Sequence, residues 1–215
     1  EAMISIGNSL GRNTMAMITD MNQTLGNTIG NAIEIREAIE TLKGHGPKDF
    51  TELCMQAAEI MLMQGKVAEN KEEARKMLDE VVASGKAFET FKDMVKAQGG
   101  NVDMIENPEL LPQSKFKTEI KSEESGNVKV LHSERLGVLA MQLGAGRETK
   151  EQDVNHAVGL ELACKRGDKV NKGDTICIVY HDEELKPQWV DELYHAFELT
   201  NEEVAPQPII EKVLS

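Results

Sequence analysis

The pattern of apolar residues changes at residues 107–112, and this change limits the possible folds more than any other feature of the chain. The segment contains Pro108 and Pro112, and proline interrupts both helices and central strands. Before it, apolar side chains recur at helical spacing in residues 1–10, 31–42, 47–64, 71–84 and 87–98. After it, Val- and Ile-containing segments predict strands at 115–120, 126–131, 154–163 and 175–180, with helices at 133–142 and 187–199. We therefore expect two domains, residues 1–112 and residues 113–215.

Residues 14–19 form a short, nearly continuous apolar run between two helical segments. Such a run is more typical of a buried strand in a parallel sheet than of a half-exposed antiparallel strand. The succession of helix and strand predicts an α/β arrangement for the first domain, whereas the strand-rich remainder predicts an α+β domain.

The composition excludes some classes of protein. A net charge of -13 over 215 residues argues against nucleic-acid binding, which needs clustered Lys and Arg. No apolar run approaches the roughly 18 residues that span a bilayer. Three cysteines without C-x-x-C spacing favour a reducing, cytoplasmic setting. Because a helical pattern begins at Glu1 rather than after an initiator Met, we expect the chain to be a piece of a longer protein.

Residues 167–174 have the pattern Gly-Asp-x-Val-x-x-Gly-Asp, which is typical of a turn, a short strand and a second turn in small β-sandwich hammerhead domains. We expect the aspartates to accept hydrogen bonds from nearby N–H groups, and Val170 to anchor the strand in the core. Lipoyl and biotinyl carriers contain similar domains, but residues 176–184 lack the modifiable Lys that a carrier needs. A structural turn is the favoured interpretation, and a carrier stays an alternative.

Two other groups of residues favour ordinary structural roles. Residues 144–147, Gly-Ala-Gly-Arg, follow a predicted helix, whereas anion-binding glycine loops usually precede one, so a helix end with a surface Arg147 is expected. The five histidines show no zinc-binding spacing. We expect His45 and His181 at the surface.

The glycine-containing loop before the helix at 31–42 is the strongest candidate site. Main-chain carbonyls of residues 25–28 and a carboxylate from the helix can form an all-oxygen cage for a hard cation. Glu37 lies off the apolar stripe of that helix, so a solvated side chain is the competing interpretation.

Several separated segments, in the correct order, resemble pyrimidine-nucleoside phosphorylase. The second half of the family's large α/β domain is resembled by residues 13–23, 37–44 and 98–100. Its C-terminal domain is resembled by residues 144–147, 156–159 and 167–174. The resemblance covers nearly the whole chain but only the C-terminal half of the family's polypeptide. It implies the remainder of a mixed-sheet α/β catalytic domain, followed by an α+β hammerhead-like (barrel-sandwich hybrid) domain. It also implies a homodimeric pentosyltransferase that cleaves uridine, thymidine and deoxyuridine reversibly, with phosphate, to the free base and (deoxy)ribose-1-phosphate.

By the same resemblance, Leu25 and Thr28 would provide main-chain carbonyls, and Glu37 its carboxylate, to a potassium ion. Thr28 stands where Ala is common in the family, which matters little if the carbonyl is the ligand. The phosphate- and base-binding residues of the family lie upstream, so no catalytic residue is assigned and the chain alone is expected to be inactive. A thymidine-specific phosphorylase and a non-enzymatic scaffold of the same ancestry remain alternatives.

Overall fold

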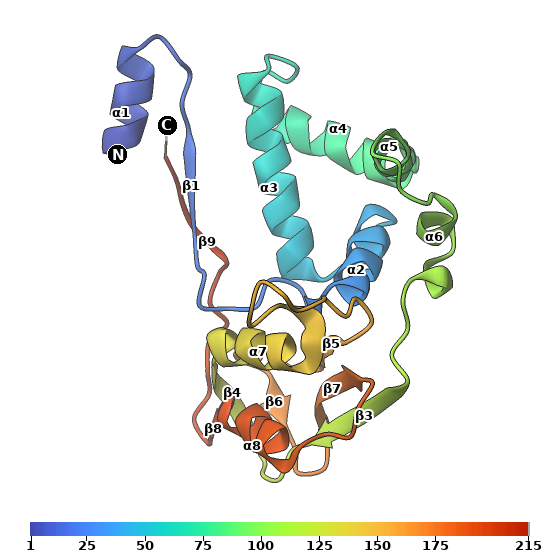
Figure 1. Ribbon diagram of the computed structural model, residues 1–215. Coiled ribbons are helices and arrows are strands. Elements are labelled where there is room, and N and C mark those ends of the chain that lie inside the picture. The colour runs from blue at the N-terminus through green and yellow to red at the C-terminus, as the bar shows by residue number, and fades with distance from the viewer. Residues whose placement is uncertain (215) are drawn as a thin grey trace.

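The computed structural model describes residues 1–214 and places a helical upper part above a strand-rich lower part (Figure 1). The upper part carries six helices: α1 (Ala2–Ser9), α2 (Ala32–Leu42), α3 (Lys48–Gln64), α4 (Lys71–Ala83), α5 (Lys86–Ala97) and α6 (Asp103–Glu106). A 3₁₀ turn (Pro108–Leu110) leads down to the lower part, whose helices are α7 (Ser133–Ala140) and α8 (Pro187–His195). The helices at 31–42, 47–64, 71–84 and 87–98 were therefore correctly predicted, within two residues at each end.

Local chemistry explains where the helices of the upper part begin. Pro47 stands at the N-cap position of α3, where its missing N–H leaves no helical hydrogen bond unmade. Asn70 caps α4, because its side-chain oxygen accepts a hydrogen bond of 2.9 Å from the N–H of Glu73. Gly85 joins α4 to α5 with a φ of 76°, a left-handed conformation that glycine adopts without strain.

A buried ion pair joins α3 to α4. The carboxylate of Glu59 is 1% exposed, and it is the buried residue of α3. Arg75 of α4 donates its Nε–H to this carboxylate, and Lys71 lies 3.6 Å from it. Arg75 also donates to Glu52, at 2.8 and 3.0 Å. The charge of the buried Glu59 carboxylate is thus compensated by Arg75 and Lys71 at the contact between the two helices.

The described residues form three sheets, and every strand pair in them is antiparallel. The largest sheet has the order β2 (Thr28–Gly30), β5 (Gly159–Leu162), β7 (Thr175–His181) and β3 (Phe116–Lys121). A second has the order β6 (Lys169–Val170), β4 (Gly126–Leu131) and β8 (Phe197–Thr200). The third is a ribbon of β1 (Ala16–Thr19) and β9 (Ile210–Leu214), which brings the two ends of the chain together beside α1 (Figure 1).

The pairing of β1 corrects one prediction. The apolar run at 14–19 suggested a buried strand of a parallel sheet, but β1 pairs antiparallel with β9 and Ile18 is 43% exposed. The apolar run could not reveal the strand direction, because that is set by β9, the strand paired with β1 among residues 1–214.

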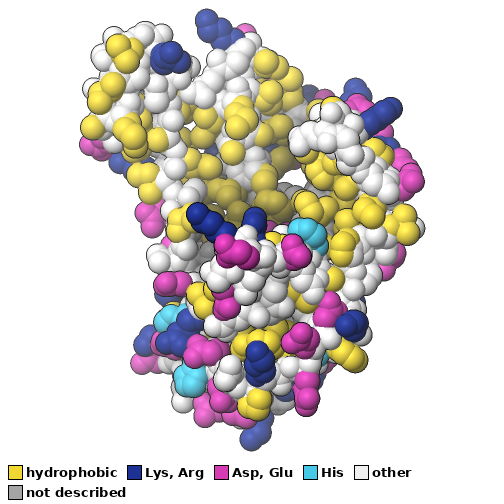
Figure 2. Space-filling model, in the orientation of Figure 1, with side chains coloured by type: hydrophobic (Ala, Val, Ile, Leu, Met, Phe, Trp, Pro, Cys, Tyr) yellow, Lys and Arg dark blue, Asp and Glu magenta, His cyan; other side chains and the backbone are white. Residues whose placement is uncertain are grey.

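The main apolar core lies in the lower part. It is built from buried side chains of the two larger sheets and of α7 and α8, including Val128, Leu136, Leu160, Cys177 and Leu193. Figure 2 shows hydrophobic side chains gathered over the upper part of one face, whereas charged side chains dominate the lower part. The chain is thus a mixed α/β structure with several antiparallel sheets, consistent with a C-terminal α+β domain. Among residues 1–214 we find no helix that combines the length and apolarity needed to cross a bilayer.

The Gly-Asp pattern at 167–174 forms the predicted structural turns. Gly167 and Gly173 have φ angles of 94° and 92°, which favour glycine. Asp168 accepts a hydrogen bond of 2.8 Å from the N–H of Lys165, and Asp174 accepts one of 2.8 Å from the N–H of Asn171. Val170 between them is 3% exposed and belongs to the core, as expected.

Two further expectations for the lower part are wrong. The helix predicted over 187–199 ends at His195, and Phe197–Thr200 forms β8 instead. His181, expected at the surface, is 7% exposed. Its ring nitrogens are both satisfied, because Nε2 lies 2.8 Å from Thr118 Oγ1 and Nδ1 lies 2.6 Å from the carbonyl of Glu183.

Candidate cation site at the 25–28 bend

The bend before β2 is shaped by Gly26, which is buried and has a φ of 69°. A Cβ atom added to Gly26 would overlap Glu37 Oε2 and would lie 3.0 Å from the carboxyl carbon. The carboxylate therefore lies directly over the bend, in space that any side chain at position 26 would fill. Glycine serves both the backbone conformation and this close approach.

Glu37 reaches the bend from the second turn of α2. Its Oε1 accepts a hydrogen bond of 2.9 Å from the N–H of Asn27. The buried side of α2 contains Ala32, Ile33 and Ile39, and Glu37 lies beside this side, half-buried. Burial raises the pKa of Glu37, while the hydrogen bond from Asn27 and the charge of Lys165 act in the opposite direction. The structure thus brings Glu37 to the loop that the sequence singled out.

The strand pairing shows where the carbonyl of Thr28 points. The N–H of Leu162 donates a hydrogen bond of 2.7 Å to the carbonyl of Asn27. In an antiparallel ladder, the next pair, Thr28 with Glu161, is then a pair that exchanges no backbone hydrogen bonds. Because β2 is the edge of its sheet, the carbonyl of Thr28 points out of the sheet, away from β5. It is available to a ligand.

The other groups of the bend that could bind a cation are also oxygen atoms. Within residues 1–214, no hydrogen-bond donor reaches the carbonyl of Leu25. The hydroxyl of Thr28 is buried and has no hydrogen-bond partner among residues 1–214. No cluster of three His, Cys, Asp or Glu side chains suited to a metal occurs in the described residues. A site here would therefore depend on main-chain carbonyls with a single carboxylate, and this all-oxygen set suits a hard cation.

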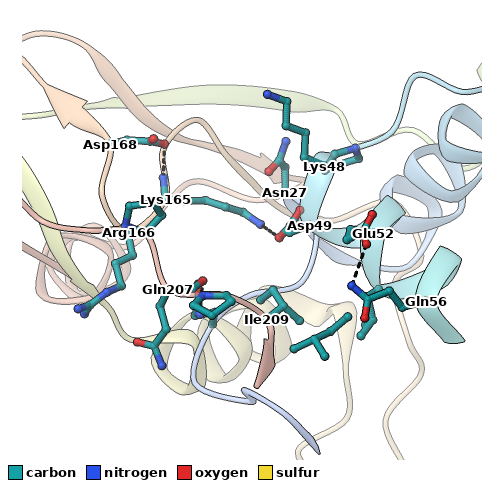
Figure 3. Close-up of a pocket in the computed structure, with 16 residues that line it drawn as sticks. Asn27, Lys48, Asp49, Glu52, Gln56, Lys165, Arg166, Asp168, Gln207 and Ile209 are labelled. Atoms are coloured by element: carbon teal, nitrogen blue, oxygen red, sulfur yellow. Dashed lines mark hydrogen bonds and ion pairs between the residues drawn. The ribbon is translucent and has the colours of Figure 1, made fainter. Parts of the chain in front are cut away.

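A second group of charged side chains holds the other side of the bend. Lys165, in the loop after β5, donates to the carbonyl of Thr24 at 3.0 Å and pairs with Asp49 of α3. Asp49 Oδ2 also accepts from the N–H of Gly26 at 3.3 Å. Figure 3 shows Lys165 extended towards Asp49 across a cleft with a volume of about 550 Å³. No local pattern in the sequence predicts this pair, because its members are 116 positions apart.

A second cleft lies on the Glu37 side of the bend and is lined by Thr28, Arg36, Glu37, Glu161 and Tyr180, among others. The hydroxyl of Tyr180 donates to Glu161 at 2.5 Å, and burial, followed by this hydrogen bond, raises the pKa of Tyr180. Asn27 lines both clefts, so both reach the bend.

The other glycine motif has the structural role that was expected. After α7 the chain makes one π turn (Met141–Ala145), and Gly144 has a φ of 108°. Arg147 follows it at the surface. The carbonyl of Ala145 accepts a hydrogen bond of 2.8 Å from Asn31, which fastens this turn to the start of α2. The motif thus ends a helix and supports the helix that carries Glu37.

Comparisons with known proteins identify this architecture. Residues 127–200 match the family model of the pyrimidine nucleoside phosphorylase C-terminal domain. The central portion of the lower part is therefore similar to the C-terminal domain of nucleoside phosphorylases.

The similarity to individual proteins extends over the whole chain. It is 45% identical over 214 residues to a pyrimidine-nucleoside phosphorylase of Staphylococcus aureus strain USA300, covering 100% of this chain and 49% of that protein. It is 46% identical over 213 residues to the protein of the same name from strain MSSA476, again covering 49% of its length. The chain spans about half the length of the curated relatives it matches, and it is homologous to the C-terminal half of pyrimidine-nucleoside phosphorylases. The resemblance drawn from the sequence is confirmed.

Proposed function

We propose that this chain is the C-terminal part of a pyrimidine-nucleoside phosphorylase that cleaves uridine, thymidine and deoxyuridine with phosphate. The observation that carries the proposal is the identity of 45% over the whole chain to proteins of that name. The geometry of the bend supports it, because the three positions implied by resemblance, Leu25, Thr28 and Glu37, lie around one bend.

In this reaction an oxygen of phosphate forms a bond to C1′ of the sugar while the bond from C1′ to the base nitrogen breaks. The base leaves with the bonding electrons and takes up a proton, giving a free pyrimidine and a sugar-1-phosphate. Because the phosphate and the departing base are both anionic in the transition state, the protein must surround them with fixed positive charge and hydrogen-bond donors.

We propose that the carbonyls of Leu25 and Thr28 and the carboxylate of Glu37 hold a potassium ion. An ion held there would supply fixed positive charge, which favours anionic reactants. The chain's own contribution is to hold oxygen atoms in place, since Gly26 leaves room for Glu37 and the N–H of Asn27 orients it. Further ligands would come from the part of the relatives that this chain does not cover.

The phosphate-binding loop and the base-binding Arg, Ser and Lys of the family have no counterpart in residues 1–215. We propose that residues 1–112 complete a catalytic α/β domain with the other half of the protein, and that residues 113–215 form a hammerhead-like domain. The whole enzyme is proposed to be a cytoplasmic homodimer. Three free cysteines fit a reducing compartment.

A hybrid protein tests the proposal. The C-terminal half of the Staphylococcus aureus relative would be replaced by this chain, and phosphate-dependent release of uracil from uridine would be measured. The hybrid is expected to be active, whereas the 215-residue chain alone is expected to release no uracil. A folded hybrid without activity, or phosphorolysis by the chain alone, would contradict the proposal.

The same hybrid tests the proposed cation site. Glu37→Gln should weaken the dependence of activity on potassium, because it removes the only charged ligand that this chain is proposed to provide. Because the base-binding residues of the family lie in the other half, the substrate range is measured on the full-length protein that contains this chain. Turnover of uridine and thymidine at similar rates there would favour the broad enzyme over the thymidine-specific alternative.

A further inference from the structure

Lys165 connects the lower part of the structure to the bend that precedes β2. Its Nζ donates to the carbonyl of Thr24 at 3.0 Å and pairs with Asp49 Oδ2. The side chains of Lys165 and Asp49 are 26% and 23% exposed. Screening by solvent is weaker for such a pair than for ions at the open surface.

The pair acts on backbone groups at both sides of Leu25. Lys165 holds the carbonyl of Thr24, and Asp49 accepts the N–H of Gly26 at 3.3 Å. Two neighbouring peptide groups are thus fixed by one lysine and one aspartate, and the orientation of the Leu25 carbonyl is determined between them. Figure 3 shows that the lysine reaches Asp49 across the cleft rather than lying along its own loop.

The base of the lysine side chain is itself fixed. The N–H of Lys165 donates to Asp168 at 2.8 Å, within the first turn of the Gly-Asp motif. Three residues earlier, the N–H of Leu162 donates to the carbonyl of Asn27 at 2.7 Å. The backbone that carries the lysine is therefore held by hydrogen bonds, and this fixes where the ammonium group meets the bend.

We propose that Lys165 is a positioning residue, which holds the Thr24–Gly26 segment against Asp49 so that the bend is formed and docked on Glu37 before any ligand arrives. The consequence for the cation rests on the proposed function: a preformed cage of carbonyls binds an ion more tightly than one that must be ordered on binding. Because Asp49 neutralises the ammonium group, the lysine adds no net positive charge that would oppose a cation at the bend.

Amide hydrogen exchange, measured by NMR on the 215-residue chain, tests the positioning role directly. Lys165→Met keeps most of the aliphatic side chain but removes the ammonium group. We expect exchange at the amides of Gly26 and Asn27 to become at least about tenfold faster, a loss of about 1.4 kcal/mol of local protection. Lys165→Arg, which keeps a cationic donor, should restore much of the protection.

Lys169→Met is the matched control, because Lys169 is an exposed lysine of the adjacent strand β6. It should leave exchange at Gly26 and Asn27 unchanged. The amides of β3 and β7 provide an internal control, since a variant that merely destabilises the lower domain would accelerate exchange there as well. Unchanged protection of the bend in Lys165→Met, or equal acceleration at the bend and in β3 and β7, would overturn the proposal.

Titration with potassium chloride, against choline chloride at equal ionic strength, separates this inference from the proposed cation site. If the bend resonances of the unaltered chain respond to potassium, Lys165→Met should weaken the response at least tenfold, and an equal response in both proteins would overturn the coupling. If the unaltered chain does not respond, the coupling is measured in the hybrid, which supplies the remaining ligands: a rise of at least about tenfold in the potassium concentration for half-maximal uracil release in Lys165→Met supports it, and an unchanged value overturns it. In either case the exchange experiment decides whether Lys165 positions the bend.

Discussion

Replacing Gly26 with alanine tests whether the bend and Glu37 form one unit. Two costs are expected. The φ of 69° is unfavourable for alanine by about 1–2 kcal/mol, partly offset by about 0.4–1 kcal/mol because alanine stiffens the unfolded chain. In addition, the new methyl group would occupy the position of Glu37 Oε2 and displace the carboxylate from the N–H of Asn27. Loss of a hydrogen bond to a charged group costs about 1.5–3 kcal/mol.

Gly99 provides a matched control for the backbone cost. Its φ is 77°, and a Cβ atom added there meets no other atom within 4 Å. Gly99→Ala should therefore carry the strain alone. Urea unfolding of both variants, followed by circular dichroism, should place Gly26→Ala below Gly99→Ala in stability by about 1.5–3 kcal/mol, without a change in the denaturant slope.

A second comparison isolates the carboxylate. In a Glu37→Ala background the overlap is absent, so Gly26→Ala should cost about as much as Gly99→Ala. If the two glycine variants differ by less than about 0.5 kcal/mol in the unaltered background, the reasoning that places Glu37 over the bend is refuted.

Three further predictions concern the rest of the chain. Arg75→Met leaves the buried carboxylate of Glu59 without its closest partner and should cost about 3–5 kcal/mol in urea unfolding, whereas Glu59→Leu combined with Arg75→Met should cost less; equal losses would contradict this account of the pair. Burial raises the pKa of both Cys164 and Cys177 to about 12, so at pH 8 a thiol reagent should modify only the exposed Cys54 in the folded chain and all three after unfolding; rapid native reaction of more than one thiol would disprove it. The folded state retains these two thiol protons above the ordinary pKa of 9.0, so their contribution to stability is complete below that value and is lost as pH rises towards 12. The urea midpoint should therefore fall over this interval, and it should fall less in a double Cys→Ala variant.

The helices could be predicted from sequence because their signals are local. Apolar residues three and four positions apart, together with Pro47, Asn70 and Gly85, define α3, α4 and α5 with little reference to the rest of the chain. The Gly-Asp turns were predictable for the same reason, since each aspartate bonds to an N–H three residues away.

Contacts between distant segments left no comparable signal. Strand β9 was not anticipated, and its pairing with β1 joins opposite ends of the chain. Strand β2 has only three residues and lies within a segment that reads as a loop. Lys165 and Asp49 are ordinary surface-type residues in the sequence, and only the fold makes them neighbours. The position of Glu37 off the apolar stripe argued for a solvated side chain, so its role as a ligand could be inferred only from the resemblance.

The shared sheet has a mechanical consequence for the proposed boundary at residue 112. Strand β2 belongs to the upper part by sequence but is the edge strand of the sheet formed by β5, β7 and β3. If the peptide bond after residue 112 were broken, the two fragments would therefore stay associated through the pairing of β2 with β5 and of β1 with β9. A protease nick there should yield fragments that co-elute under native conditions and separate only in denaturant.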